Sequence, residues 1–225
     1  MKIDLNETLM LYTNLGPAEE PRRRVLNAFL DEEMPMERLA AMAPEWVKRA
    51  PAGQSRGSYA AGLTLRTAFR EARKREAEAV LVLSDEAVPV AGFMEKLAAL
   101  NLPGNSGMVL LSGVAPASSP EVEELGLDAR VTSVPASPCQ LLPVREFGDW
   151  TAVLVRRQAW RKVSRLLRKD GTGRVAWMPG QRCVVPNGLL VHAVIPGLVE
   201  RHLVPDAVQP TPEASGQHAL PKTFP

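Results

Sequence analysis

The sequence is short of cysteine, and this shortage excludes two classes of protein. Only 2 of its 225 residues are cysteines, Cys139 and Cys183, and they are far apart and form no CxxC pair. A zinc site or a disulfide framework needs more cysteines at closer spacing, so neither is indicated. Two buried or half-buried thiols are the expected outcome.

Long apolar runs are also missing. No segment approaches the roughly 18 to 20 uninterrupted apolar residues that a membrane helix requires. Met1 to Asp4 shows neither the basic region nor the apolar core of a signal peptide, so we expect a cytoplasmic protein without a membrane span.

Net charge is the third quantity that is small. Lysine and arginine number 27 against 25 acidic residues, a formal charge of +2, which excludes a chain that is basic throughout. A local patch can still bind an anionic partner, because binding to a polyanion depends on how charges cluster.

The length suits one α/β domain, which we place at residues 1–206, with a proline-rich tail at residues 207–225.

The most informative stretch is an apolar run that changes abruptly into polar residues. Val80 to Leu83 are four branched aliphatic residues without alternation, which is typical of a strand covered on both faces. They are followed by Ser84, Asp85 and Glu86. Ligands gather beyond the carboxyl ends of such strands, and acidic groups there are well placed to hold a divalent cation. The alternative is a strand end followed by a solvated turn.

Strand and helix signals alternate along the rest of the chain and predict an α/β fold with a mostly parallel sheet. Strands are expected at residues 9–13, 80–83, 108–111 and 150–155, and short apolar runs at 182–185 and 189–194. Helices are expected from about residue 21 to 30, and at 58–77, 92–100 and 157–169. Prolines limit residues 31–55 to short helical pieces such as Met36 to Ala43. Residues 115–143 are predicted to form a long surface loop.

Two of the expected helices carry basic residues at helical spacing. The first has Arg66, Arg70, Arg73 and Lys74, and the second has Arg157, Arg161, Arg165 and Arg168. Such stripes are usually solvated faces, and a docking surface for an anionic partner is the alternative.

Five stretches resemble family 25 glycosyltransferases and related GT-A enzymes in their order and spacing. They are Leu11 to Leu15 with the arginines that follow, Gly57 to Leu63, Ala79 to Val90, Phe147 to Val155, and Ile195 to His202. The resemblance implies a GT-A (Rossmann-like) fold, a mixed and mostly parallel sheet flanked by helices in a single domain. It also implies transfer of a sugar from a nucleotide-diphosphate donor, a UDP-sugar being expected, with Mn²⁺ or Mg²⁺ as cofactor.

Site residues follow from the same resemblance. Asp85 and Glu86 match the acidic metal-binding motif, although Ser84 stands where the family has an acid, and His202 matches a C-terminal histidine ligand. The nucleotide would be bound by residues at the end of the first strand, at the start of the second helix and in the acidic motif: Thr13, Asn14, Arg22, Arg23, Gly57, Ser58, Ser84 and Asp85.

The acceptor side is less defined. Asp149 and Asp170 are the candidate general bases for the acceptor hydroxyl, and each could equally be a turn or capping residue. A saccharide, a protein or a modified base in DNA is compatible as acceptor. The alternative function is a GT-A-like module that has lost metal and catalysis and binds a nucleic-acid or protein partner through its basic helices.

Overall fold

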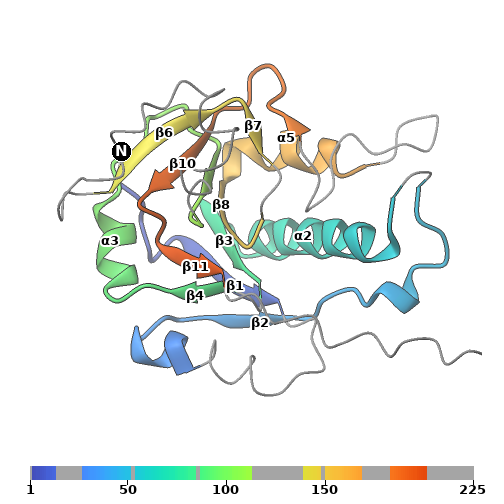
Figure 1. The fold of residues 1–225 in the computed structure, drawn as a ribbon, viewed down its shortest axis with the longest axis horizontal. Helices are drawn as coiled ribbons and strands as arrows, with labels where there is room; N and C mark the ends of the chain where they lie inside the picture. The colour runs from blue at the N-terminus through green and yellow to red at the C-terminus, as the bar shows by residue number, and fades with distance from the viewer. Residues whose placement is uncertain are drawn as a thin grey trace, which may run out of the picture.

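The computed structural model describes residues 2–13, 27–51, 54–84, 87–112, 139–147, 150–168 and 183–201. A seven-stranded sheet forms their centre, in the order β2-β1-β3-β8-β5-β10-β6 (Figure 1). The strands are β1 (Thr8–Thr13), β2 (Glu37–Leu39), β3 (Ala79–Leu83), β5 (Met108–Leu110), β6 (Gln140–Val144), β8 (Ala152–Arg156) and β10 (Val191–Ile195).

The sheet is mixed. β1 pairs in parallel with β2 and β3, and β5 with β10, whereas β8 is antiparallel to both β3 and β5, and β6 is antiparallel to β10. β1, β2, β3, β5 and β10 therefore run in one direction, with β8 and β6 opposed. The prediction of a mixed, mostly parallel α/β sheet flanked by helices is confirmed.

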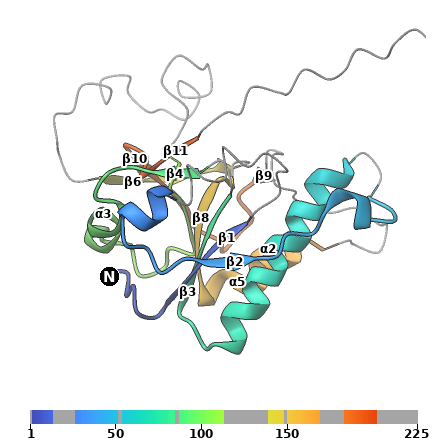
Figure 2. The same ribbon diagram turned by 90° about the horizontal axis from the view of Figure 1, so that it is seen from below.

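Helices cover both faces of this sheet (Figures 1 and 2). Helices α2 (Arg56–Lys74) and α5 (Arg157–Leu166) pack on one face, and α3 (Phe93–Ala99) and the helical residues 27–31 pack on the other. β3 contributes to both sides, because Val80 and Val82 point to the first face and Leu81 and Leu83 to the second. This is why the strand shows no polar alternation.

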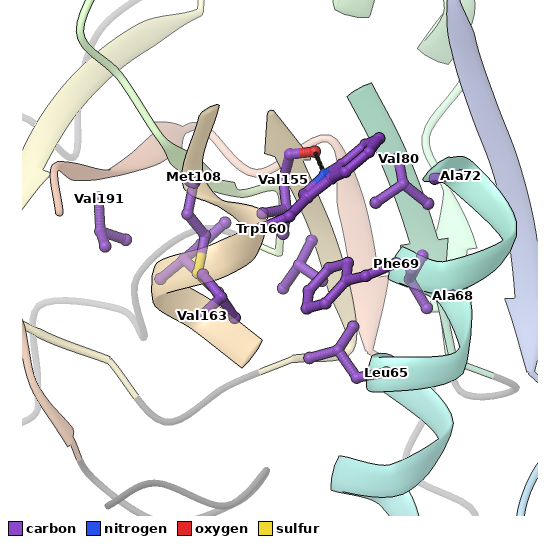
Figure 3. Packing of buried hydrophobic residues seen from close by; sticks show 14 of the residues in the cluster. Leu65, Ala68, Phe69, Ala72, Val80, Met108, Val155, Trp160, Val163 and Val191 are labelled. Carbon is purple, nitrogen blue, oxygen red and sulfur yellow. Dashed lines mark hydrogen bonds between the residues drawn. The ribbon is translucent and has the colours of Figure 1, made fainter. Parts of the chain in front are cut away.

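Helices α2 and α5 together form the α2–α5 layer, whose large buried side chains pack against the first face of the sheet (Figure 3). Phe69 of α2 is 1% exposed and packs among Leu65, Val80 and the side chains of α5. Trp160 is buried beside them, and its indole Nε1 donates to the carbonyl oxygen of Val155 at 2.9 Å. The indole therefore satisfies its one polar group while filling the core.

Two predictions about local structure are wrong. Residues 36–43 do not form a helical piece, because Glu37–Leu39 is strand β2, paired with β1 from Leu11↔Glu37 onward. The surface loop predicted for residues 115–143 is also too long at its end, since Gln140–Val144 is edge strand β6. In both cases pairing with a neighbouring strand outweighs a weak local preference.

Short elements complete the described structure. β4 (Ala87–Pro89) pairs with β11 (Val199–Arg201), β7 (Glu146–Phe147) pairs with β9 (Cys183–Val184), and η1 (Pro44–Trp46) is a 3₁₀ turn beside α2. In the parts of the chain described here, no helix combines the length and hydrophobicity needed to cross a membrane.

Candidate functional site at the carboxyl edge of the sheet

Thr13 and Ser84 end two neighbouring parallel strands. The β1–β3 register runs from Thr8↔Ala79 to Tyr12↔Leu83, so these two residues come next on each strand. Ser84 also continues the hydrogen bonding between β3 and β8, because its amide donates at 2.7 Å to the carbonyl oxygen of Thr151, the residue before β8. The structure thus brings together two of the residues that the sequence assigned to nucleotide binding.

The pleat directs both side chains toward α2. Alternate residues of a strand point to opposite faces. Leu11 of β1 and Val82 of β3 belong to the cluster under α2 and α5, and Thr13 and Ser84 follow them by two positions. Both hydroxyl-bearing residues therefore lie at the carboxyl edge on the α2 side.

Thr13 carries a polar atom without an internal partner. The residue is 0% exposed, and its Oγ1 has no hydrogen-bond partner within the described chain. Leaving a buried hydroxyl unsatisfied costs about 1–3 kcal/mol. An orphaned hydroxyl at a strand end is the type of group that a bound ligand satisfies.

The amino end of α2 lies toward the same edge. α2 packs along β3 and ends at Lys74, shortly before β3 begins at Ala79, so it runs antiparallel to the strand and starts near the strand's carboxyl end. A helix amino end carries partial positive charge and favours anions. The first turn is open, because Gly57 is exposed and an added Cβ there would have only the Ser55 Oγ, at 3.9 Å, within 4 Å.

One amide of that first turn is already used. The Ser55 hydroxyl accepts from the backbone N–H of Ser58 at 3.1 Å and lies 3.1 Å from the Ser58 hydroxyl. This N-cap begins the helix at Arg56. Of the two predicted residues, Gly57 is therefore the better placed to offer its amide to an anion.

Gln54 is a candidate that the sequence interpretation did not single out. It precedes the N-cap of α2, and its side-chain Oε1 is buried without a hydrogen-bond partner in the described residues. Its only sequence signal was its place in the loop before a helix start. Among the described residues, the Thr13 Oγ1 and the Gln54 Oε1 are the two buried side-chain polar atoms left unpaired, one at the end of β1 and the other just before α2.

β4 and β11 bring the acidic segment close to the C-terminal segment. Their antiparallel register is Val199↔Pro89, Glu200↔Val88 and Arg201↔Ala87. A further contact joins them to the main sheet, since Leu198 N donates at 2.7 Å to the carbonyl oxygen of Leu111, the residue after β5. Along the sequence, the residue before Ala87 is Glu86 and the residue after Arg201 is His202.

The remaining predicted site residues lie outside the described residues. They are Asn14, Arg22, Arg23, Asp85, Glu86, Asp149, Asp170 and His202. Over the described ranges no group of three His, Cys, Asp or Glu residues is arranged to hold a metal. All three predicted metal ligands fall outside that search, so the metal site stays a prediction.

A second polar pair, inside the fold, has a structural role. His192 of β10 is 7% exposed and Ser106 is 0% exposed, and the Ser106 hydroxyl lies 2.9 Å from the histidine Nδ1. Each side chain of the pair is the other's hydrogen-bond partner, so both buried polar groups are satisfied within the fold.

His192 should make folding stability depend on pH. Burial lowers the pKa of His192 below its usual value of 6.5. The unfolded chain then takes up a proton before the folded one does, so stability is complete above about pH 6.5 and is lost as the pH falls below it. Urea unfolding at pH 7.5 and pH 5.5 should show a larger loss for the wild type than for His192→Asn, and an equal loss would contradict this assignment.

Comparisons with known proteins do not assign this chain to a family. No family model matches the sequence, and no curated protein matches it. Among solved structures, the chain is similar to A197 from STIV, with a TM-score of 0.48 and 11% identity over 88% of this chain and 86% of that one. It is also similar to a glycosyltransferase involved in the glycosylation of the major capsid of PBCV-1, with a TM-score of 0.39 and 9% identity over 71% and 64%.

Proposed function

We propose that the protein is a GT-A-type glycosyltransferase, related to family 25, that moves a sugar from a nucleotide-diphosphate donor to an acceptor hydroxyl. The observation that carries the proposal is the buried, unpaired Oγ1 of Thr13 at the carboxyl end of β1. It occupies the position where the sequence resemblance expects the nucleotide. A bound nucleotide would supply the missing hydrogen-bond partner.

The donor would lie across the edge formed by β1, β3 and the start of α2. Thr13 would hydrogen-bond the nucleotide, and Ser84 ends the neighbouring strand on the same face. The open first turn of α2 at Gly57 would face the negative charge of the diphosphate. Arg22 and Arg23 follow β1 in the sequence and are the proposed additional cations for the phosphates.

Asp85, Glu86 and His202 would hold Mn²⁺ or Mg²⁺. The cross-strand pair Arg201↔Ala87 supports this set, because Glu86 and His202 are the next residues along the two chain segments. Carboxylate oxygens suit both ions, and an imidazole suits Mn²⁺ better than Mg²⁺. The ion would offset the negative charge that builds up on the departing diphosphate.

The acceptor hydroxyl would transfer its proton to a carboxylate. Asp149 is the better supported of the two candidates, because it lies two residues before Thr151, whose carbonyl binds the Ser84 amide at this edge. Asp170 is the second candidate. A saccharide, a protein or DNA would be the acceptor.

Thermal unfolding with UDP and Mn²⁺ tests the proposal. A ligand at about 100 times its dissociation constant stabilises the folded state by about 2.7 kcal/mol, which for a chain of this size raises Tm by roughly 5–10 °C. We expect that rise for the wild type with UDP and Mn²⁺ together, and its loss in Glu86→Ala. The exposed carboxylate Glu45, on η1, provides the control Glu45→Ala, which should respond like the wild type.

The absence of any Tm response to UDP, GDP, CDP or ADP, with or without Mn²⁺, would contradict the proposed function. A response that survives Glu86→Ala would contradict the metal assignment alone.

A further inference from the structure

Helices α2 and α5 carry two rows of arginines on the surface of the α2–α5 layer. Both rows have the spacing i, i+4, i+7, which places three side chains on one face of a helix. We call them together the arginine face: Arg66, Arg70 and Arg73 of α2, and Arg161, Arg165 and Arg168 of α5 and its last turn. Arg66 is half-buried and the other five are exposed.

The two rows lie next to each other. α2 and α5 are in contact and cover the same face of the sheet (Figure 1). On α2, Thr64 accepts from the Met42 amide at 2.9 Å, which marks the flank of the helix toward η1. Arg66 and Arg70 project from the opposite flank, about 200° and 240° further round at 3.6 residues per turn, and this flank is toward α5.

The charge of Arg168 acts on Arg66, which indicates that the two rows approach each other at this point. The pKa of Arg66 is lowered by burial first, and then by the positive charges of Arg168 and Arg70. The positive charge of Arg168, just past the end of α5, therefore acts on Arg66 of α2. Like charges held together in this way are destabilising unless an anion neutralises them.

Acidic partners are nearly absent from these helices. α5 contains no acidic residue, and the one acidic side chain of α2, Glu71, is paired with Lys74 at 2.7 Å. Elsewhere the protein does pair its arginines, since Arg157 binds Glu78 at 2.8 Å and Arg75 binds Glu37. Within the described chain, the six residues of the arginine face take part in no ion pair.

We propose that the arginine face binds the phosphate backbone of duplex DNA. Arginine presents a planar fork of N–H donors that matches phosphate oxygens. Packed helices lie 8–10 Å apart, so two rows on neighbouring helices have a separation comparable to the roughly 12 Å major groove of B-form DNA. A-form RNA has a much narrower major groove.

A lipid surface fits this face less well. Helices that lie on membranes add large apolar side chains to their basic ones. The large hydrophobic residues that are exposed in the described structure are Leu30, Trp46, Val184 and Leu190, and none belongs to α2 or α5. The surface therefore offers charge without apolar groups to insert.

The test is fluorescence anisotropy with a labelled 20-base-pair DNA duplex of arbitrary sequence between 50 and 200 mM NaCl. Six phosphate contacts predict a slope near −5 for the logarithm of affinity against the logarithm of salt concentration. The variant Arg161→Gln/Arg165→Gln/Arg168→Gln should bind about tenfold more weakly or worse at 50 mM NaCl, with the slope reduced by about 3.

The control removes the same charge from other exposed sites, in Arg38→Gln/Lys48→Gln/Arg145→Gln. It should stay within about threefold of the wild type, because its residues lie on other elements. Equal weakening in the control, or none in the α5 variant, would overturn the proposal, as would equal affinity for an RNA duplex or binding to anionic vesicles instead of DNA. Glu86→Ala should leave DNA binding unchanged, so this result is separate from the proposed sugar transfer.

Discussion

Thr13→Val is expected to stabilise the ligand-free protein and to weaken nucleotide binding. Valine has nearly the shape of threonine but no hydroxyl, so it removes the unpaired Oγ1 from a fully buried position. Relief of that unsatisfied group should raise the free energy of unfolding by about 1 kcal/mol, which corresponds to a Tm increase of roughly 2–4 °C. The same change should reduce UDP affinity about tenfold or more, because it deletes the proposed hydrogen bond.

Thr64→Val is the matched control for this prediction. Thr64 is also buried, at 1% exposed, but its hydroxyl donates to Ala60 O at 3.0 Å and accepts from Met42 N at 2.9 Å. Removing it should lower the free energy of unfolding by about 1–3 kcal/mol, since the Met42 amide loses its partner.

Urea unfolding measures both stabilities, and calorimetric titration with UDP and Mn²⁺ measures the affinities. Destabilisation of Thr13→Val to the level of Thr64→Val would mean that its hydroxyl is satisfied in the native protein. Unchanged UDP affinity would place the nucleotide elsewhere.

Phe69→Ala should cause the largest loss of stability, about 3–5 kcal/mol. Phe69 is 1% exposed between α2, β3 and α5 (Figure 3), and truncation would remove its buried apolar area and leave a cavity. Loss of this size is a large fraction of the 5–15 kcal/mol typical of a whole domain.

Leu30→Ala serves as the comparison, because Leu30 is 75% exposed and should change stability by no more than about 0.5 kcal/mol. Urea unfolding monitored by circular dichroism checks both variants. A loss below about 1 kcal/mol in Phe69→Ala would contradict the packing of α2 on the sheet.

Four residues of the candidate site, Thr13, Gly57, Ser58 and Ser84, lie at the strand ends and the helix start that the order of residues along the chain predicts. The apolar run that ends in Ser84 predicts a strand end, and strand ends and helix starts meet at one edge of a parallel sheet. The pairing of β1 with β3 and the placement of Gly57 at the start of α2 agree with that expectation. Gln54 was not anticipated, because a glutamine in a loop carries no signal until its burial is known.

The sequence by itself determined the buried strands and the amphipathic helices. Val80 to Leu83, Val153 to Val155 and the apolar stripes of α2 and α5 are local patterns, and their periods indicate which faces are covered. Only the tertiary structure decided β2 and β6, because Glu37–Leu39 and Gln140–Val144 become strands by pairing with β1 and β10. The unpaired hydroxyl of Thr13 and the convergence of the arginine rows also depend on contacts between distant segments, which no local pattern encodes.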